Sequence, residues 1–185
     1  MEKSKEALKT LIKGESEAVL MYDSFSLKAA EEGWKNIAAL FKALSQAERI
    51  HIKNHLNALG EDFTAETVEV ASQSTADNLI RAIEGETEES RKLYPRLIRD
   101  IKSETKSEYG KVARLSMTWA RKVEKEHARL LKKAAKALSK GRDLEVTNIY
   151  LCQVCGNIVL NELGEETCAV CGHDRQFFNQ VKGVN

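Results

Sequence analysis

Two glutamate–histidine pairs have the residue types and the spacing of a metal site built on helices. The pairs are Glu48 with His51 and Glu124 with His127. Three residues along an α-helix turn through about 300°, so each carboxylate shares a helix face with its imidazole, one turn away. A single Glu-x-x-His arises by chance on surface helices, whereas two in one chain indicate a shared site.

Each pair is preceded, one predicted helix earlier, by a further glutamate. Glu15 precedes the first pair and Glu86 precedes the second. One helix-hairpin unit is therefore used twice, and the two copies are expected to converge on a pair of metal ions. Glu89 follows Glu86 by three residues and shares its helix face, whereas Ala18 occupies the corresponding position after Glu15. The two halves of the site are therefore unequal.

These donors favour iron or manganese, because such ions bind carboxylate oxygen together with imidazole nitrogen. Carboxylates gathered in the core of a bundle are strongly destabilising unless cations neutralise them. Two ferrous ions bring a formal charge of about +4, as do two ferric ions with a bridging oxide, so peroxide can oxidise the pair without changing the charge of the site. Other glutamates, such as Glu17 and Glu126, are expected to be solvated. Two interpretations of His55, one turn after His51, are open: a residue that supports the ligands or is a spare ligand itself, and a surface histidine, which is the preferred prediction.

Four cysteines form two Cys-x-x-Cys-Gly turns near the end of the chain: Cys152 with Cys155, and Cys168 with Cys171. Glycine permits the tight turn in which backbone N–H groups point at sulfur. In a chain without a secretion signal, this pattern indicates four thiolates around one metal rather than disulfides. Tetrahedral sulfur ligands suit iron or zinc, and the choice stays open. Alone, the motif would more often be a structural zinc ribbon. Beside a di-iron site, however, an iron ion held by the four cysteines would serve as a one-electron centre.

Apolar residues at helical spacing predict four helices, over residues 4–32, 35–59, 74–102 and 107–139. Residues 61–73 lack the pattern and are interpreted as a crossover connection, which makes the whole a four-helix bundle. Pro95 lies inside the third helix and is expected to kink it or force a local bulge.

The composition changes after Gly141, which indicates a second, smaller domain. Short β-prone runs follow at residues 146–151 and 158–160, together with the cysteine turns. We therefore expect a helical domain over residues 1–143 and a small metal domain over residues 144–185.

Composition and charge exclude several kinds of partner. The 185 residues are 42% hydrophobic and 31% charged, which is ordinary for a helical protein with amphipathic faces. The formal net charge of +1 gives no electrostatic reason to expect nucleic acid or an anionic membrane as a partner. The charged N-terminal stretch has no apolar run long enough for a signal peptide or a membrane span, so a cytoplasmic location is expected.

The chain resembles the rubrerythrin family over nearly its whole length. The segments that carry the resemblance are Gly14-Glu15 with Tyr22, Ala47-Glu48 to His51, Gly85-Glu86 to Glu89 with Tyr94-Pro95, Glu124 to His127, and the two cysteine turns with twelve residues between them. Glu89 separates this family from ferritins, which usually lack a second glutamate on the third helix. The resemblance implies an all-α, ferritin-like four-helix bundle with a long crossover between helices 2 and 3, plus a small C-terminal β-rich, rubredoxin-like metal domain.

The resemblance also implies a role for each ligand around two non-haem iron ions. Glu48 and Glu124 would bridge the irons, which are joined by an oxo or hydroxo bridge when oxidised. Glu15 would bind the first iron, completed by His51 or by Glu89 according to oxidation state. His51 is thus interpreted as the conditional ligand.

By the same resemblance, Glu86 and His127 would bind the second iron, and Tyr22 and Tyr94 would be the tyrosines that contact the ligands. The family's activity is reduction of hydrogen peroxide to water. Electrons come from a reductase or rubredoxin through an iron ion held by the four cysteines. Family members are dimers, in which that centre can serve the di-iron site of the partner subunit. The resemblance thus implies an oxidoreductase that protects against oxidative stress.

Two other functions remain open from the residues. A ferritin-like iron-binding or ferroxidase protein with a zinc-bound tail would use the same carboxylates, but a storage cage needs neither Glu89 nor a cysteine domain. A nucleic-acid-binding zinc ribbon is disfavoured, because the tail has few basic residues, such as Arg175 and Lys182. Two positions depart from the family pattern: Asn157 stands where an aromatic residue is common, and Ala169 where proline is usual.

Overall fold

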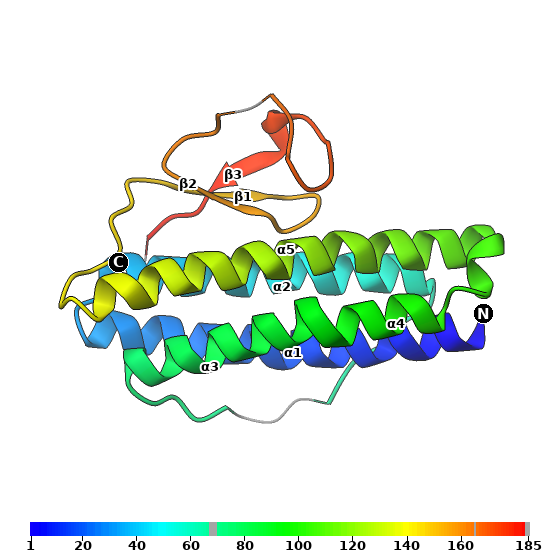
Figure 1. Ribbon diagram of the computed structural model, residues 1–185, viewed down its shortest axis with the longest axis horizontal. Coiled ribbons are helices and arrows are strands. Elements are labelled where there is room, and N and C mark those ends of the chain that lie inside the picture. Colours follow the sequence, from blue (N-terminus) through cyan, green and yellow to red (C-terminus); the bar gives the residue numbers. More distant parts are fainter. Residues whose placement is uncertain (67–69, 165, 184–185) are drawn as a thin grey trace.

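The computed structural model describes residues 1–66, 70–164 and 166–183, and shows a bundle of long helices with a small sheet on one side (Figure 1). The helices are α1 (Glu2–Glu31), α2 (Lys35–Leu59), α3 (Thr75–Glu88), the π-helical turn η1 (Glu89–Leu93), α4 (Tyr94–Asp100), the short 3₁₀ turn η2 (Glu104–Lys106) and α5 (Glu108–Leu138). α1 packs on α2, and α3 on α5. The segments α3, η1 and α4 follow one another without a break and form the third predicted helix. The predicted four-helix bundle is therefore confirmed.

The connection from α2 to α3 runs along the length of the bundle, so both helices start at the same end (Figure 1). The predicted crossover over residues 61–73 is confirmed for its described part, and residues 67–69 lie outside the described residues. Gly60 ends α2 at φ 71°, a left-handed conformation that glycine adopts without strain. Ser74 begins α3 by accepting a hydrogen bond from the amide of Asp77. Local residue choices thus set where the crossover starts and stops.

Pro95 accounts for the π-helical turn in the third helix. The N–H of Tyr94 bonds to the carbonyl of Glu89, five residues earlier, which is the π-helical spacing. Pro95 has no N–H to offer the next carbonyl, that of Ser90. The guanidinium of Arg121, on α5, donates to that carbonyl instead, over 3.1 Å. The predicted local bulge is confirmed, and η1 begins at Glu89, one of the predicted ligands.

The C-terminal unit is a three-stranded antiparallel sheet in the order β2-β1-β3. Its elements are β1 (Ile149–Cys152), β2 (Ile158–Leu160), the 3₁₀ turn η3 (Arg175–Phe177) and β3 (Phe178–Gln180). β1 and β2 fall in the predicted β-prone runs, whereas β3 was not predicted. The sheet lies against α2 and α5 (Figure 1).

The sheet and the bundle share one apolar core. Leu144, Ile149 and Leu151 belong to the same buried cluster as residues of α1, α2, α3 and α5. In the connecting segment, Asp143 accepts hydrogen bonds from the amides of Asn36 and Ile37 at the start of α2, over 2.8 and 3.1 Å. The division into domains at residues 143 and 144 stays a prediction, and the two parts are tightly packed together.

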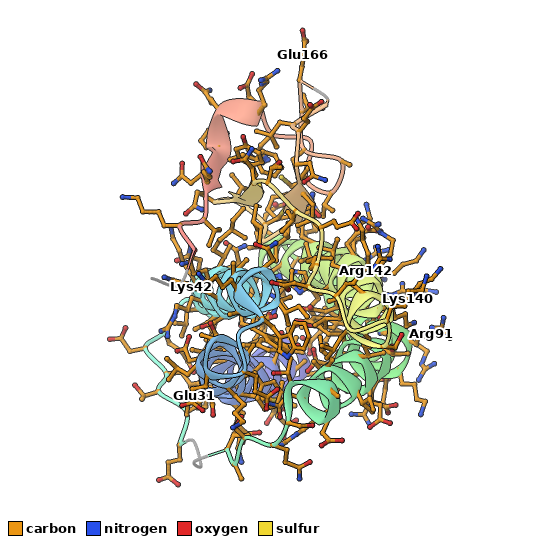
Figure 2. All side chains as sticks on the ribbon, turned by 90° about the vertical axis from the view of Figure 1, so that its left-hand side faces the viewer. Glu31, Lys42, Arg91, Lys140, Arg142 and Glu166 are labelled. Atoms are coloured by element: carbon orange, nitrogen blue, oxygen red, sulfur yellow. The ribbon has the colours of Figure 1, made fainter. Side chains whose placement is uncertain are left out.

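Two apolar clusters fill the two ends of the bundle. One includes the C-terminal half of α1 and the N-terminal half of α2, and the other includes the N-terminal half of α1 and residues of α4. Charged side chains such as Arg91 and Glu31 point outward (Figure 2). Across the described parts of the chain, every helix is too short or too polar to cross a membrane. Between the two apolar clusters, the bundle also buries polar and charged side chains, and their burial needs an explanation.

Candidate metal centres

Six of the seven predicted di-metal ligands meet between the two apolar clusters. They form two overlapping groups of four, and the ligand atoms of each group lie within 4.8 Å of one another. The groups are Glu15, Glu48, His51 and Glu124, and Glu48, Glu86, Glu124 and His127. All these residues are buried. Glu48 and Glu124 belong to both groups, as expected of bridging ligands.

The two shared glutamates each present one oxygen to each histidine. Nδ1 of His51 lies 2.7 Å from Oε2 of Glu48 and 2.9 Å from Oε1 of Glu124. Nδ1 of His127 lies 3.4 Å from Oε1 of Glu48 and 3.1 Å from Oε2 of Glu124. Each of the two carboxylates therefore reaches both candidate metal positions, and each of these positions faces one of the two imidazoles.

Most of the converging ligand atoms have no hydrogen-bond partner in the described protein. These atoms are Oε2 of Glu15, both carboxylate oxygens of Glu48, Nδ1 of His51, Oε2 of Glu86 and Oε1 of Glu124. Buried polar atoms are normally paired, and leaving carboxylates unpaired costs free energy. Two cations placed between the groups would satisfy these atoms at once. Oxygen and nitrogen donors in this mixture suit iron or manganese, so the residues fit a pair of such ions.

The outer nitrogens of both histidines contact the first cysteine turn. Nε2 of His51 lies 3.2 Å from the carbonyl oxygen of Cys155, and Nε2 of His127 lies 3.3 Å from that of Gly156. A carbonyl only accepts, so each Nε2 carries the proton and each Nδ1 is left to bind a metal. Gly156 has φ +85°, and a Cβ there would lie 2.9 Å from Nε2 of His51. Glycine therefore allows the turn to approach the histidines this closely.

Each predicted tyrosine bonds to a glutamate of the opposite helical hairpin. Tyr22 of α1 donates to Oε1 of Glu86, and Tyr94 of α4 donates to Oε1 of Glu15, both over 2.5 Å. Tyr22 follows Glu15 by seven residues, whereas Tyr94 follows Glu86 by eight. The π-helical turn lies between Glu86 and Tyr94 and takes up the extra residue, so both phenols reach the site.

Glu89 is the one candidate ligand that belongs to neither group of four. It is partly buried and lines a surface pocket of about 670 Å³ between α1 and α3. It still interacts with the site, because burial and the neighbouring charge of Glu124 raise the pKa of its carboxyl. Its exchange with His51 as a ligand stays a prediction.

The prediction that His55 is a surface residue is wrong, because the side chain is fully buried. Its Nδ1 lies 2.8 Å from the hydroxyl of Ser116, and its Nε2 lies 3.0 Å from the hydroxyl of Tyr94. The available signal was its position one turn after His51, on the helix face that carries the ligands. Burial, with a further contribution from His51, lowers the pKa of His55 to about 3, so its ring is neutral.

Ser116 is a further member of the site that the sequence patterns did not indicate. It lies eleven residues before His127, about three helical turns, and so shares its face of α5. Serine is too common on helices for that spacing to be a signal. The carbonyl oxygens of Cys155 and Gly156 were also missed, since a backbone group has no sequence signature of its own.

Without metal ions, the buried carboxylates favour protonation. Burial, together with the charges of neighbouring carboxylates, raises the pKa of Glu15 and of Glu86 well above the usual range. Burial alone would do the same to Glu124, but His51 and His127 hold its pKa well below the usual range. The site therefore binds protons in the absence of cations.

We expect the metal-free protein to lose thermal stability as the pH rises from about 5 to about 8. Glu15, Glu86 and Glu89 have raised pKa values, so the folded chain retains protons that the unfolded chain releases above about 4.5. Each such group lowers the free energy of unfolding by up to about 1.4 kcal/mol per pH unit until it ionises. Glu124 has no effect in this range, because its lowered pKa leaves it ionised in both the folded and the unfolded chain. His55, with a pKa lowered to about 3, opposes the trend up to about pH 6.5, whereas the raised pKa values of His51 and His127 add to it above that pH.

Thermal unfolding of chelator-treated protein across this pH range measures the effect. Ferrous-loaded protein is the control, because bound cations replace the protons and remove the trend. A metal-free protein whose melting temperature rises over the same range would contradict these charge states.

The four cysteines meet as predicted and form a second metal site. The sulfurs of Cys152 and Cys171 lie 3.8 Å apart, and those of Cys155 and Cys168 lie 3.6 Å apart. A tetrahedral ion with bonds of about 2.3 Å places its sulfurs about 3.8 Å apart, so the residues fit iron or zinc. The amide of Asn157 lies 3.8 Å from the sulfur of Cys168 and directs a polar N–H at the cluster. Asn157, one of the two positions that depart from the family pattern, therefore contacts the four-cysteine site through its side chain.

Comparisons with known proteins agree with both centres. The family model described as Rubrerythrin matches residues 6–135. Rubrerythrin-2 of Clostridium acetobutylicum is 33% identical over 175 residues, which cover 92% of each chain. Nigerythrin of Nitratidesulfovibrio vulgaris is 32% identical over 94% of this chain and 84% of its own. A solved structure of nigerythrin in a mixed-valent state superposes with a TM-score of 0.85 at 30% identity, covering 96% of this chain and 86% of that one.

Proposed function

This chain belongs to the rubrerythrin family, and from that membership and the geometry of its two centres we propose that it reduces hydrogen peroxide to water. Proteins of this family are oxidoreductases with a carboxylate–histidine di-iron site and a four-cysteine, rubredoxin-like site, and this chain has both. The proposed reaction consumes one peroxide, two protons and two electrons and yields two water molecules.

The observation that carries the proposal is the contact between the two centres. His51 and His127 hydrogen-bond to the carbonyls of Cys155 and Gly156. Cys155 is itself one of the four sulfur ligands, so a few covalent bonds and one hydrogen bond separate the two metal sites. A storage protein has no need of such a contact, whereas a reductase that takes electrons one at a time does.

The residues divide the work of holding the two ions. Glu48 and Glu124 would bridge them, with Glu15 and His51 on one side, and Glu86 and His127 would complete the other. Bound as ferrous ions, the two irons supply the two electrons that one peroxide requires. The protein groups fix the ligands: each histidine is held at Nε2 by a carbonyl, and each terminal glutamate at one oxygen by a tyrosine.

Glu89 is the residue best placed to meet the substrate on its way in. It lines the pocket of about 670 Å³ between α1 and α3 and also acts electrostatically on Glu15. Peroxide is small enough to enter through such a pocket. We propose that Glu89 donates and accepts protons at this entrance. We also propose that it exchanges with His51 as a ligand when the irons change oxidation state.

The partners follow from the same proposal. A reductase or rubredoxin would supply electrons to the four-cysteine centre, with iron rather than zinc there, and the protein would work as a homodimer. Free cysteines that serve as metal thiolates suit a reducing compartment, and we propose a cytoplasmic location. The contact between Cys155 and His51 lies within one chain, so we propose that each subunit can feed its own di-iron site.

The test is stoichiometric oxidation of the reduced protein. Protein loaded with iron and reduced chemically under anaerobic conditions is expected to be reoxidised by about one equivalent of peroxide for each di-iron site and about half an equivalent for each four-cysteine iron, because one peroxide accepts two electrons. The thiolate-to-ferric band of the four-cysteine centre should be bleached by reduction and return on oxidation. Failure of peroxide to reoxidise the protein would refute the proposal. A colourless cysteine site together with large iron-filled assemblies would favour the ferritin-like alternative instead.

A further inference from the structure

His55 is a buried imidazole that the proposed reaction does not use directly. It lies on α2, one turn beyond His51, and contacts the hydroxyls of Ser116 on α5 and of Tyr94 on α4. Tyr94 in turn contacts Oε1 of Glu15 on α1. Four side chains from all four arms of the bundle thus form one continuous line that ends at a metal ligand.

The Glu15 carboxylate at the end of this line fixes which group donates and which accepts in each of its hydrogen bonds. Glu15 as a carboxylate only accepts, so the Tyr94 hydroxyl donates to it. The Tyr94 oxygen then accepts from Nε2 of His55, which leaves Nδ1 of His55 as the acceptor for the Ser116 hydroxyl. A neutral imidazole offers one donor and one acceptor, and both are used here.

The far end of the line decides which oxygen of Glu15 is available. Oε1 accepts the Tyr94 hydroxyl and lies 4.0 Å from Nδ1 of His51, whereas Oε2 has no partner among the described residues. Glu15 belongs to the first group of four ligands. From this arrangement, we infer that His55 and Ser116 are positioning residues that hold the Tyr94 hydroxyl on Oε1 of Glu15 and so fix the orientation of this carboxylate in the first group of four ligands. The inference rests on the di-iron site of the proposed function but not on its reaction with peroxide.

Within the part of the chain that the structure describes, the other half of the site has no equivalent of this hydrogen-bonded line. Tyr22 donates to Oε1 of Glu86 in the same way, and Oε2 of Glu86 is likewise unpaired. Among the described residues, however, the ring of Tyr22 packs against Phe25 and Phe41 instead of a histidine. A metal ion at Glu15 would therefore be held by a glutamate whose tyrosine is hydrogen-bonded to a histidine, and an ion at Glu86 by one whose tyrosine is not. Tyr22 thus offers a matched internal control.

The experiment is anaerobic withdrawal of ferrous ions from the fully loaded protein by a chromophoric chelator, with no peroxide present. His55→Phe removes both hydrogen bonds and is expected to weaken one of the two ions about tenfold, the usual effect of losing a group that orients a ligand, while the other ion is unchanged. His55→Gln keeps a donor near the Tyr94 oxygen and should restore most of the loss. Ser116→Ala, which removes only the outer contact, should give a smaller loss at the same ion and serves if His55→Phe does not fold.

A double-mutant cycle separates positioning from a general structural effect. His55→Phe combined with Tyr94→Phe should cost no more than Tyr94→Phe alone, because both changes break the same line, whereas His55→Phe and Tyr22→Phe should be additive. Infrared spectra of the loaded protein should show a shift of the Glu15 carboxylate bands in His55→Phe, because the hydrogen bond that Tyr94 donates to Oε1 is no longer supported. Equal weakening of both ions, or additivity with Tyr94→Phe, would overturn the inference. Peroxide inactivity of the wild type would leave these results unaffected.

Discussion

Replacement of Glu48 by alanine is expected to empty the carboxylate–histidine site and leave the four-cysteine site loaded. Glu48 belongs to both groups of four ligands, and neither of its oxygens has another partner in the described protein. Its loss removes a ligand from both ions at once and leaves Nδ1 of His51 without its nearest oxygen, at 2.7 Å. Metal analysis should fall from about three ions per chain to about one, with the visible band of the cysteine centre unchanged.

The matched control for this prediction is Glu126→Ala. Glu126 lies on α5 two residues after Glu124, but its carboxylate faces outward and pairs with Arg129. Such a surface pair contributes about 0–1 kcal/mol, so this variant should retain all its metal. Retention of two ions by Glu48→Ala would contradict the bridging role. Loss of the cysteine-bound ion as well would mean that the two parts do not fold independently, which their shared apolar core makes a real alternative.

The second prediction concerns the turn that joins the two centres: Gly156→Ala should separate them. The added Cβ would lie 2.9 Å from Nε2 of His51 and 3.2 Å from the carbonyl of Ala47. Neither a ligand-bearing ring nor a helix backbone can move easily, so the turn must withdraw and its carbonyls must leave both histidines. Electron supply from the cysteine centre to the di-iron site should slow, while peroxide still oxidises a di-iron site that has been reduced directly.

Gly172→Ala is the matched control, because Gly172 occupies the same position in the second cysteine turn. It has φ +74°, against +85° at Gly156, but a Cβ there meets nothing within 4 Å. Both variants pay the left-handed strain of about 1–2 kcal/mol, and only Gly156→Ala adds about 1–3 kcal/mol of overpacking. Stopped-flow reduction and thermal unfolding of the two variants distinguish the effects. Equal slowing of electron supply in both would show that strain in the turns, and not contact with the histidines, sets the rate.

The candidate ligand types, the helices that carry them and the cluster of four cysteines could be predicted from the sequence alone. Those features depend on local spacing. Glu48 and His51 share a face because an α-helix turns through a fixed angle per residue, and Cys-x-x-Cys-Gly is recognisable because glycine permits the tight turn between its thiolates. The bulge at Pro95 was also predictable, since a missing N–H is a local property.

The contacts between individual atoms of the site could not be predicted in this way, because they depend on how the helices pack. His55 looked like a surface residue because one helix at a time gives no hint that Ser116 and Tyr94 would close over it. Glu89 shares a helix face with Glu86 in sequence, but the π-helical turn begins there and places it beside an outer pocket. Contacts between distant segments depend on how the helices pack, which helical spacing does not encode.

The same reason explains the two Glu-x-x-His pairs. Their spacing predicted a metal pair, but it contained nothing about the carbonyls of Cys155 and Gly156 that now fix both imidazoles. Those carbonyls lie about a hundred residues from His51 and about thirty from His127, and backbone groups look alike in any sequence. The chain thus specified its metal ligands locally, and packing of the small sheet on α2 and α5 connected them to the cysteine centre.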